Sequence, residues 1–89
     1  MTKKFTPEQE HVARRSELYD YLLTYHSNAI KRTGNTIYLL RQKSVKVKKG
    51  RYGYVDYKTG ENGNSIDYLM KYFGYRFDDA VDALLHKQP

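Results

Sequence analysis

The sequence predicts a small α+β domain with a long N-terminal helix, a three-stranded antiparallel sheet and two C-terminal helices. Apolar residues recur with a helical period near both ends of the chain, whereas the middle third alternates apolar and basic residues between turn signals. The chain has 89 residues, so we expect one domain over residues 1–89. A chain this short buries only about 60% of its unfolded surface, and its core therefore depends on a few apolar faces.

The first helix is expected over residues 7–26, after a flexible segment at residues 1–6. Thr6 is a suitable N-cap, and Pro7 suits the first helical position. An apolar stripe with i, i+3, i+4, i+7 spacing follows at Leu18, Tyr21, Leu22 and Tyr25. This spacing predicts a continuous helix that ends at His26, and a turn signal follows at residues 33–35.

Residues 36–57 are expected to form the sheet, with strands at 36–41, 44–48 and 51–57. In the second strand Val45 and Val47 alternate with Lys46 and Lys48. Because neighbouring side chains of a strand point to opposite faces, the valines are expected to face a core and the lysines to face solvent. The alternation therefore predicts a basic face on the sheet.

Two helices are expected at residues 64–73 and 77–86. Asn64 and Asp67 have the spacing of a capping box, and Gly74 occupies the place of a left-handed C-terminal residue. The last helix carries its apolar residues on one face, at Phe77, Val81, Leu84 and Leu85. We expect that face to pack on the helix at 64–73.

Basic charge is concentrated in the middle of the chain. Residues 22–54 contain eight Lys and Arg residues and no Asp or Glu, whereas the rest has eight basic and ten acidic residues. Such a cluster favours a polyanionic partner, because Lys and Arg displace counterions from a phosphate backbone. The candidate nucleic-acid-binding cations are Lys31, Arg32, Arg41, Lys43, Lys46, Lys48, Lys49 and Arg51. The alternative is a solvated basic face with no partner.

Tyrosines are interleaved with these cations at Tyr38, Tyr52, Tyr54 and Tyr57. Exposed aromatic rings stack on unpaired bases, so the combination favours a single strand. Tyr52, beside Lys49 and Arg51, is the best stacking candidate. The alternative is that these tyrosines are ordinary strand residues, half-buried and hydrogen-bonded.

A possible phosphate-contact loop lies at Gly63, Asn64 and Ser65, since backbone N–H groups are free at the start of a helix. The alternative is a turn followed by a helix cap. The sequence has no nucleophile, histidine and acid in a catalytic spacing, so we expect no catalytic residues and no enzyme.

The chain contains no cysteine, and its histidines, His11, His26 and His86, are dispersed, so we expect no metal and no cofactor. No apolar run approaches the roughly 20 residues of a membrane helix, and no membrane association is expected. The basic start is followed by polar residues where a signal peptide needs an apolar stretch, which favours a cytoplasmic protein.

Residues 44–54, 60–72 and 77–81 resemble the CHC2-type zinc-ribbon domain of bacterial DnaG-like primases, most strongly in the run from Gly63 to Tyr72. The chain is also similar to the N-terminal domain of toprim-containing primase-like proteins of mobile elements, in residues 18–22 and 60–64. The zinc-ligand positions of the primase domain fall on Asn35, Tyr38, Asp56 and Thr59. Since this set has a single carboxylate and neither a thiolate nor an imidazole, the resemblance implies a metal-free form whose former zinc space is closed by hydrogen bonds and aromatic packing.

The resemblance implies a DNA-binding accessory protein in the replication of a phage, plasmid or integrative element, with single-stranded DNA favoured and a primase, polymerase or helicase as a possible partner. A second hypothesis is a module that docks on such a protein or on a defence complex. Its anchors are the basic face or an exposed edge at Tyr68, Tyr72 and Tyr75. A third is a minor enzyme or nucleotide-binding domain.

Overall fold

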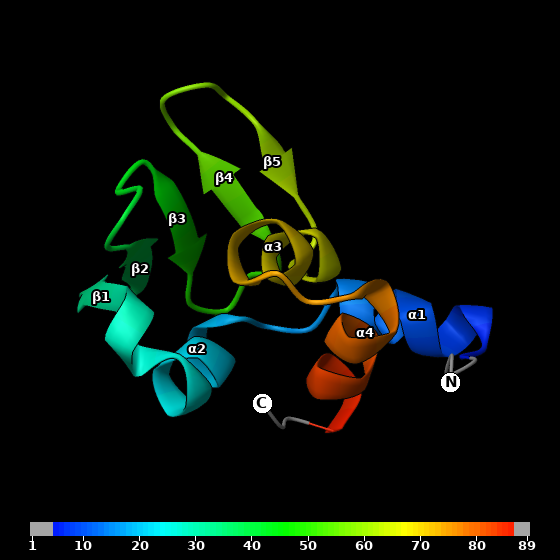
Figure 1. The fold of residues 1–89 in the computed structure, drawn as a ribbon. Helices are drawn as coiled ribbons and strands as arrows, with labels where there is room; N and C mark the ends of the chain where they lie inside the picture. The colour runs from blue at the N-terminus through cyan, green and yellow to red at the C-terminus, as the bar shows by residue number, and fades with distance from the viewer. Residues whose placement is uncertain (1–4, 87–89) are drawn as a thin grey trace.

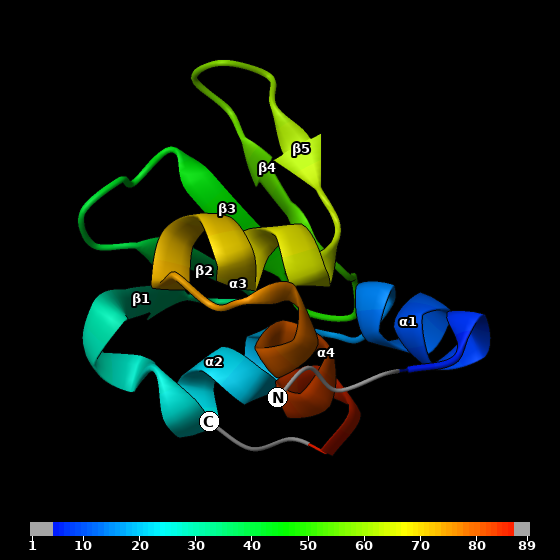
Figure 2. The same cartoon turned by 45° about the vertical axis from the view of Figure 1, so that its right-hand side comes forward.

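The computed structural model describes residues 5–86, which fold into one layer of strands and one layer of helices (Figure 1, Figure 2). The strands are β1 Ile30–Thr33, β2 Thr36–Leu39, β3 Val45–Lys48, β4 Tyr54–Asp56 and β5 Asn62–Gly63. They form a five-stranded antiparallel sheet in the order β1-β2-β3-β4-β5. The helices are α1 Pro7–Arg14, α2 Tyr19–Tyr25, the 3₁₀ turn η1 Ser27–Ala29, α3 Ser65–Phe73 and α4 Phe77–His86.

The predicted single helix over residues 7–26 is wrong, because the chain breaks between α1 and α2. Long-range contacts engage the backbone at the break. The Ser16 carbonyl accepts a hydrogen bond from the Ser65 hydroxyl, and Glu17 forms a β-bridge with Tyr52. Neither Gly nor Pro occurs there, so the break has no local signal in the sequence.

The predicted three-stranded sheet over residues 36–57 is also wrong, because a strand is added at each edge. Strand β1 was missed since only Ile30 is buried, which leaves no apolar alternation. Strand β5 has two residues, lies beyond the predicted sheet and pairs with Tyr54 and Val55. Gly53 has a φ of 75°, and a Cβ there would lie 2.1 Å from the Gly63 carbonyl oxygen, so β5 approaches closely only because residue 53 is glycine.

The helix ends agree with the sequence prediction. Asn64 and Asp67 form a reciprocal capping box, with the Asp67 N–H 2.9 Å from Asn64 Oδ1 and the Asn64 N–H 3.1 Å from Asp67 Oδ2. Gly74 ends α3 with a φ of 71°. Thr6 caps α1, and Pro7 is the first residue of that helix. Residue 6 of the segment expected to be flexible is therefore ordered by the cap. Residues 1–4 of that segment lie outside the described residues.

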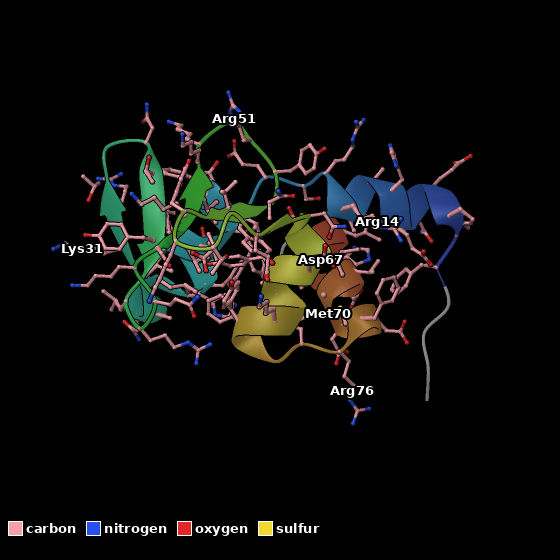
Figure 3. The ribbon with its side chains drawn as sticks, turned by 90° about the horizontal axis from the view of Figure 1, so that it is seen from above. Arg14, Lys31, Arg51, Asp67, Met70 and Arg76 are labelled. Atoms are coloured by element: carbon pink, nitrogen blue, oxygen red, sulfur yellow. The ribbon has the colours of Figure 1, made fainter. Side chains whose placement is uncertain are left out.

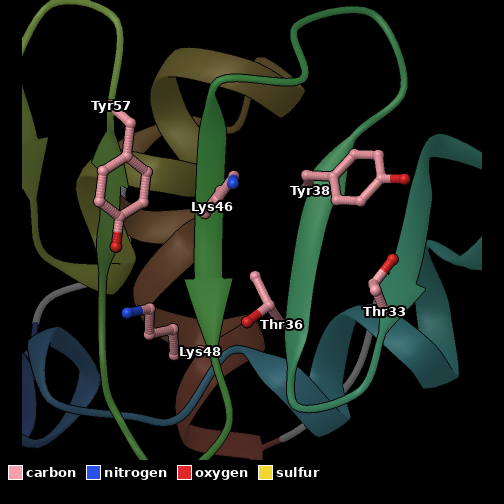
Figure 4. A pocket seen from close by; sticks show the side chains of 6 residues that line it. All are labelled: Thr33, Thr36, Tyr38, Lys46, Lys48 and Tyr57. Atoms are coloured by element: carbon pink, nitrogen blue, oxygen red, sulfur yellow. The ribbon is translucent and has the colours of Figure 1, made fainter.

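The core lies between the sheet and the helices. One sheet face contributes Ile37, Leu39, Val45 and Val47, all at most 1% exposed. Helices α1, α3 and α4 pack on one another, so α4 contacts α1 as well as the expected α3. Because every helix lies on this side, the other face of the sheet stays open to solvent (Figure 4). Within the described residues, no helix is long and apolar enough to cross a membrane.

Candidate nucleic-acid interface

The open side of the sheet carries basic and aromatic side chains in register. Lys31 on β1 is opposite Tyr38 on β2, Tyr38 is opposite Lys46 on β3, and Lys46 is opposite Val55 on β4. We call this side the outer face. Opposed residues of neighbouring strands lie side by side, so the row alternates a cation, a ring and a cation across three strands.

A groove of about 590 Å³ runs over this face (Figure 4). It is lined by Thr33, Thr36, Tyr38, Lys46, Lys48 and Tyr57. Figure 4 shows the lysines on the central strand, with the two tyrosine rings on either side of it. The groove thus combines positive charge with two aromatic walls.

The Tyr57 ring contacts both lysines of β3. Its ring centre lies 5.3 Å from the ammonium nitrogen of Lys46 and 5.7 Å from that of Lys48. These are cation–π distances. The Tyr57 side chain is nevertheless 54% exposed. Its place at the end of the third predicted strand, among the interleaved tyrosines, was the only sequence signal, and the sequence favoured Tyr52 over it.

A second hollow of about 150 Å³ continues from the groove, since Lys46, Lys48 and Tyr57 line both. It adds Arg51 and Tyr52, and the Tyr52 side chain is 50% exposed. The guanidinium carbon of Arg15 lies 5.7 Å from the centre of the Tyr52 ring. Arg15, at the break between α1 and α2, therefore lies beside this hollow.

Within residues 5–86, the basic side chains of this face form no ion pair. In the part of the chain that the structure describes, ion pairs join Glu10 to Arg14 and Glu61 to Lys71, and Asp82 lies 3.4 Å from Nε2 of His86. None of the basic residues between Lys31 and Arg51 takes part in these pairs. Glu17 accepts a hydrogen bond from the Gly50 N–H. The lysines of the groove are therefore available to a polyanion.

Four of the predicted cations lie away from the groove. Arg41 donates a hydrogen bond to the Tyr72 carbonyl at the end of α3. Lys49 has its ammonium nitrogen 5.8 Å from the ring centre of Tyr19. Arg32 is opposite the core residue Ile37, so strand alternation directs its side chain to the helix side. Lys43 is exposed in the loop between β2 and β3.

The predicted phosphate-contact loop is occupied by its own side chains. The N–H groups of Asn64 and Asp67 are engaged in the capping box. The Ser65 side chain is fully buried, donates to Ser16 and accepts the Gly53 N–H at 3.1 Å. The carboxylate of Asp67 adds negative charge at the helix start. This loop is therefore left out of the proposed interface.

The positions of the zinc-ligand pattern are not all brought together by the fold. Asn35 accepts the Lys49 N–H at 2.8 Å, at the end of the sheet where Thr36 is opposite Lys48. Asp56 is opposite Val45, at the other end. Tyr38 lies on the outer face, whereas Asp56 is buried on the core side. The expectation that the four residues close one former zinc space is wrong, because Asn35 and Tyr38 lie apart from Asp56.

Asp56 instead fastens the turn before β5. Its buried carboxylate accepts hydrogen bonds from the Gln42 side chain at 3.0 Å and from the Lys58 N–H at 2.9 Å. The pKa of Asp56 is lowered mainly by a hydrogen bond from the Ser44 hydroxyl. Burial acts in the opposite direction and raises the pKa, whereas the hydrogen bonds from Lys58 and Gln42 lower it further. Within residues 5–86, no group of three His, Cys, Asp or Glu side chains is placed to hold a metal ion.

The aromatic edge expected for protein docking is not exposed. Tyr68 and Tyr72 are buried in a ring cluster with Tyr54. Tyr75 is half-buried, and its hydroxyl lies 2.8 Å from Nε2 of His26. These three residues hold α3 and the loop after it in place, so they do not provide docking anchors.

Comparison of the chain with protein-family models, with curated proteins and with solved structures gives no match. The relation to primase domains therefore rests on the residue pattern alone. The outer face, with its unpaired lysines and exposed rings, is an independent basis for a functional proposal.

Proposed function

We propose that the protein binds single-stranded nucleic acid, with single-stranded DNA favoured, on the outer face of its sheet. The observation that carries this proposal is the groove in which Lys46 and Lys48 flank the exposed ring of Tyr57. The lysines supply charge for phosphates, and the ring supplies a surface on which a base can stack. Tyr38, Arg51, Tyr52 and Lys31 extend the surface on either side.

The spacing of the rings favours a single strand over a duplex. Neighbouring strands lie about 4.8 Å apart, so β2 and β4 are separated by about 10 Å, with β3 between them. Tyr38 and Tyr57 therefore stack on separate bases and do not clamp one base between them. Only a strand whose bases are unpaired and spread apart presents two free base faces at once.

The resemblance to primase N-terminal domains supports a role as a cytoplasmic accessory protein in the replication of a phage, plasmid or integrative element. On this proposal the protein has no catalytic centre. A primase, polymerase or helicase supplies the chemistry, and the outer face holds the template strand near it.

Fluorescence anisotropy with a labelled oligo-dT, its duplex with oligo-dA and heparin as competitor tests the proposal. We expect the single strand to bind more tightly than the duplex of equal length and to resist heparin better than the duplex does. Equal affinities for the single strand and the duplex would contradict the proposal. Displacement of both nucleic acids at the same heparin concentration would also contradict it, because it would show that the outer face attracts any polyanion through its charge alone.

A further inference from the structure

A second groove, of about 520 Å³, lies where the end of α3 meets η1 and the residues after β2. We call it the Leu40 groove, and its lining includes Ala29, Leu40, Arg41, Lys71, Tyr72 and Phe73. None of its lining residues lines the groove of the outer face. The two grooves therefore have separate linings.

The floor of the Leu40 groove is apolar and held in shape. Leu40 is 47% exposed, and its N–H donates to the Ala29 carbonyl at 3.1 Å. Phe73 is partly buried against the core, and its ring stacks on His26 with 4.5 Å between ring centres. A single exposed leucine on a convex surface needs no explanation, but one beside an aromatic ring in a concavity is typical of a binding site.

Two cations lie at the rim above this floor. The Arg41 guanidinium donates to the Tyr72 carbonyl, which fixes its position while leaving other N–H groups free to bind. The Lys71 ammonium lies 5.5 Å from the Tyr72 ring centre and pairs with Glu61. With two cations and one acid, the rim retains positive charge above an apolar floor.

We propose that the Leu40 groove binds a peptide segment of a partner protein that carries a large apolar side chain next to acidic residues. The apolar side chain packs against Leu40 and Phe73, and the carboxylates pair with Arg41 and Lys71. The charge complementarity argues for an acidic peptide, and the volume falls within the roughly 300–1,000 Å³ usual for ligand sites. This surface does not depend on nucleic-acid binding, since it uses none of the same residues.

Selection of random peptides displayed on phage against the immobilised full-length protein tests this proposal. We expect enriched peptides to share a large apolar residue beside Asp or Glu. Synthetic fluorescein-labelled copies of these peptides should bind the protein in an anisotropy assay. Leu40→Ser should lower their affinity by about tenfold or more. Lys46→Gln, on the outer face, is the matched control and should leave peptide affinity unchanged.

A charge exchange identifies the contact without relying on weakened binding alone. The Lys71→Glu variant should have a lower affinity for the acidic peptide. The same variant should bind a copy of the peptide in which the acidic residue is replaced by Lys. Thermal melts by circular dichroism verify that each variant is folded. Enriched peptides without acidic residues, or an unchanged affinity in Leu40→Ser, would overturn the proposal. Self-association in sedimentation runs that Leu40→Ser abolishes would also overturn it, because the occupant would then be a second copy of the chain.

Discussion

The ammonium nitrogen of Lys46 lies 5.3 Å from the centre of the Tyr57 ring, and Lys48 approaches the same ring. Charge and stacking surface are thus held together at one point of the outer face. Electrostatic binding depends on salt through counterion release, whereas stacking releases few counterions. The two contributions can therefore be separated by measuring affinity against salt concentration.

Neutralising the groove lysines should weaken single-strand binding with little dependence on base sequence. For Lys46→Gln and Lys48→Gln we expect the log–log salt slope to flatten by about 0.7 for each phosphate that the variant no longer neutralises. Titrations of oligo-dT over a range of salt concentrations measure it. Arg76→Gln is the control, because Arg76 lies on the opposite side of the molecule from Arg51 (Figure 3). Lys87, another candidate control, lies outside the described residues. An equally weakened Arg76 variant would indicate attraction without a defined site.

Removing the Tyr57 ring should act differently. Tyr57→Ala is expected to cost about 1–3 kcal/mol of binding free energy while leaving the salt slope nearly intact, because the lysines remain. Tyr52→Ala should behave in the same way. Tyr57→Phe keeps the ring and should retain affinity, which distinguishes stacking from a hydrogen bond of the hydroxyl. A Phe variant as weak as the Ala variant would contradict stacking at this position.

The purified protein should contain no stoichiometric zinc. The residues at the pattern positions cannot form a tetrahedral site, and Asn35 and Asp56 lie at opposite ends of the sheet. Elemental analysis of the protein, with unfolding curves before and after chelation, provides the measurement. One zinc per chain, together with unfolding on chelation, would show that the proposed loss of the metal is wrong.

Leu84 should be a major determinant of stability. Its side chain is 1% exposed in the layer formed by α1, α3 and α4, so Leu84→Ala is expected to cost about 2–5 kcal/mol. Urea unfolding measures this destabilisation. Met70→Ala is the matched control, because Met70 is 40% exposed on α3 and should change stability little. A chain truncated before Asp78 should also lose cooperative unfolding, and unchanged unfolding would mean that α4 adds nothing to the core.

Asp56 should make the protein sensitive to acid. Because the folded state lowers the pKa of this carboxyl, the unfolded chain takes up its proton first, near the ordinary pKa of about 3.9. Its contribution to stability is therefore complete at neutral pH and is lost as the pH falls through the folded pKa. Urea midpoints between pH 7 and pH 3 should fall less steeply in Asp56→Asn than in the unchanged protein. Parallel curves would show that Asp56 is not responsible.

Local features of this protein follow from its sequence because short-range interactions decide them. The Asn64 cap, the left-handed Gly74 and the outward direction of Lys46 and Lys48 each depend on neighbours within a few residues. For the same reason the sequence predicted a basic sheet face that faces solvent. The sequence also placed Tyr57 among the interleaved tyrosines. It did not predict the contact of the Tyr57 ring with Lys46 and Lys48.

The tertiary structure alone decided the rest. The break between α1 and α2 depends on contacts of Ser16 and Glu17 with residues far along the chain, so local spacing along the chain could not reveal it. Strand β5 exists because Gly53 lets another strand approach its backbone. Strand register placed Lys46 beside Tyr38 and Val55 and put Asn35 and Asp56 at opposite ends of the sheet. Contacts between distant segments brought Tyr57 to Lys46 and Arg41 to the end of α3. Pairing between distant segments is decided by the packing of the whole core, and the spacing of residues along the chain does not contain it.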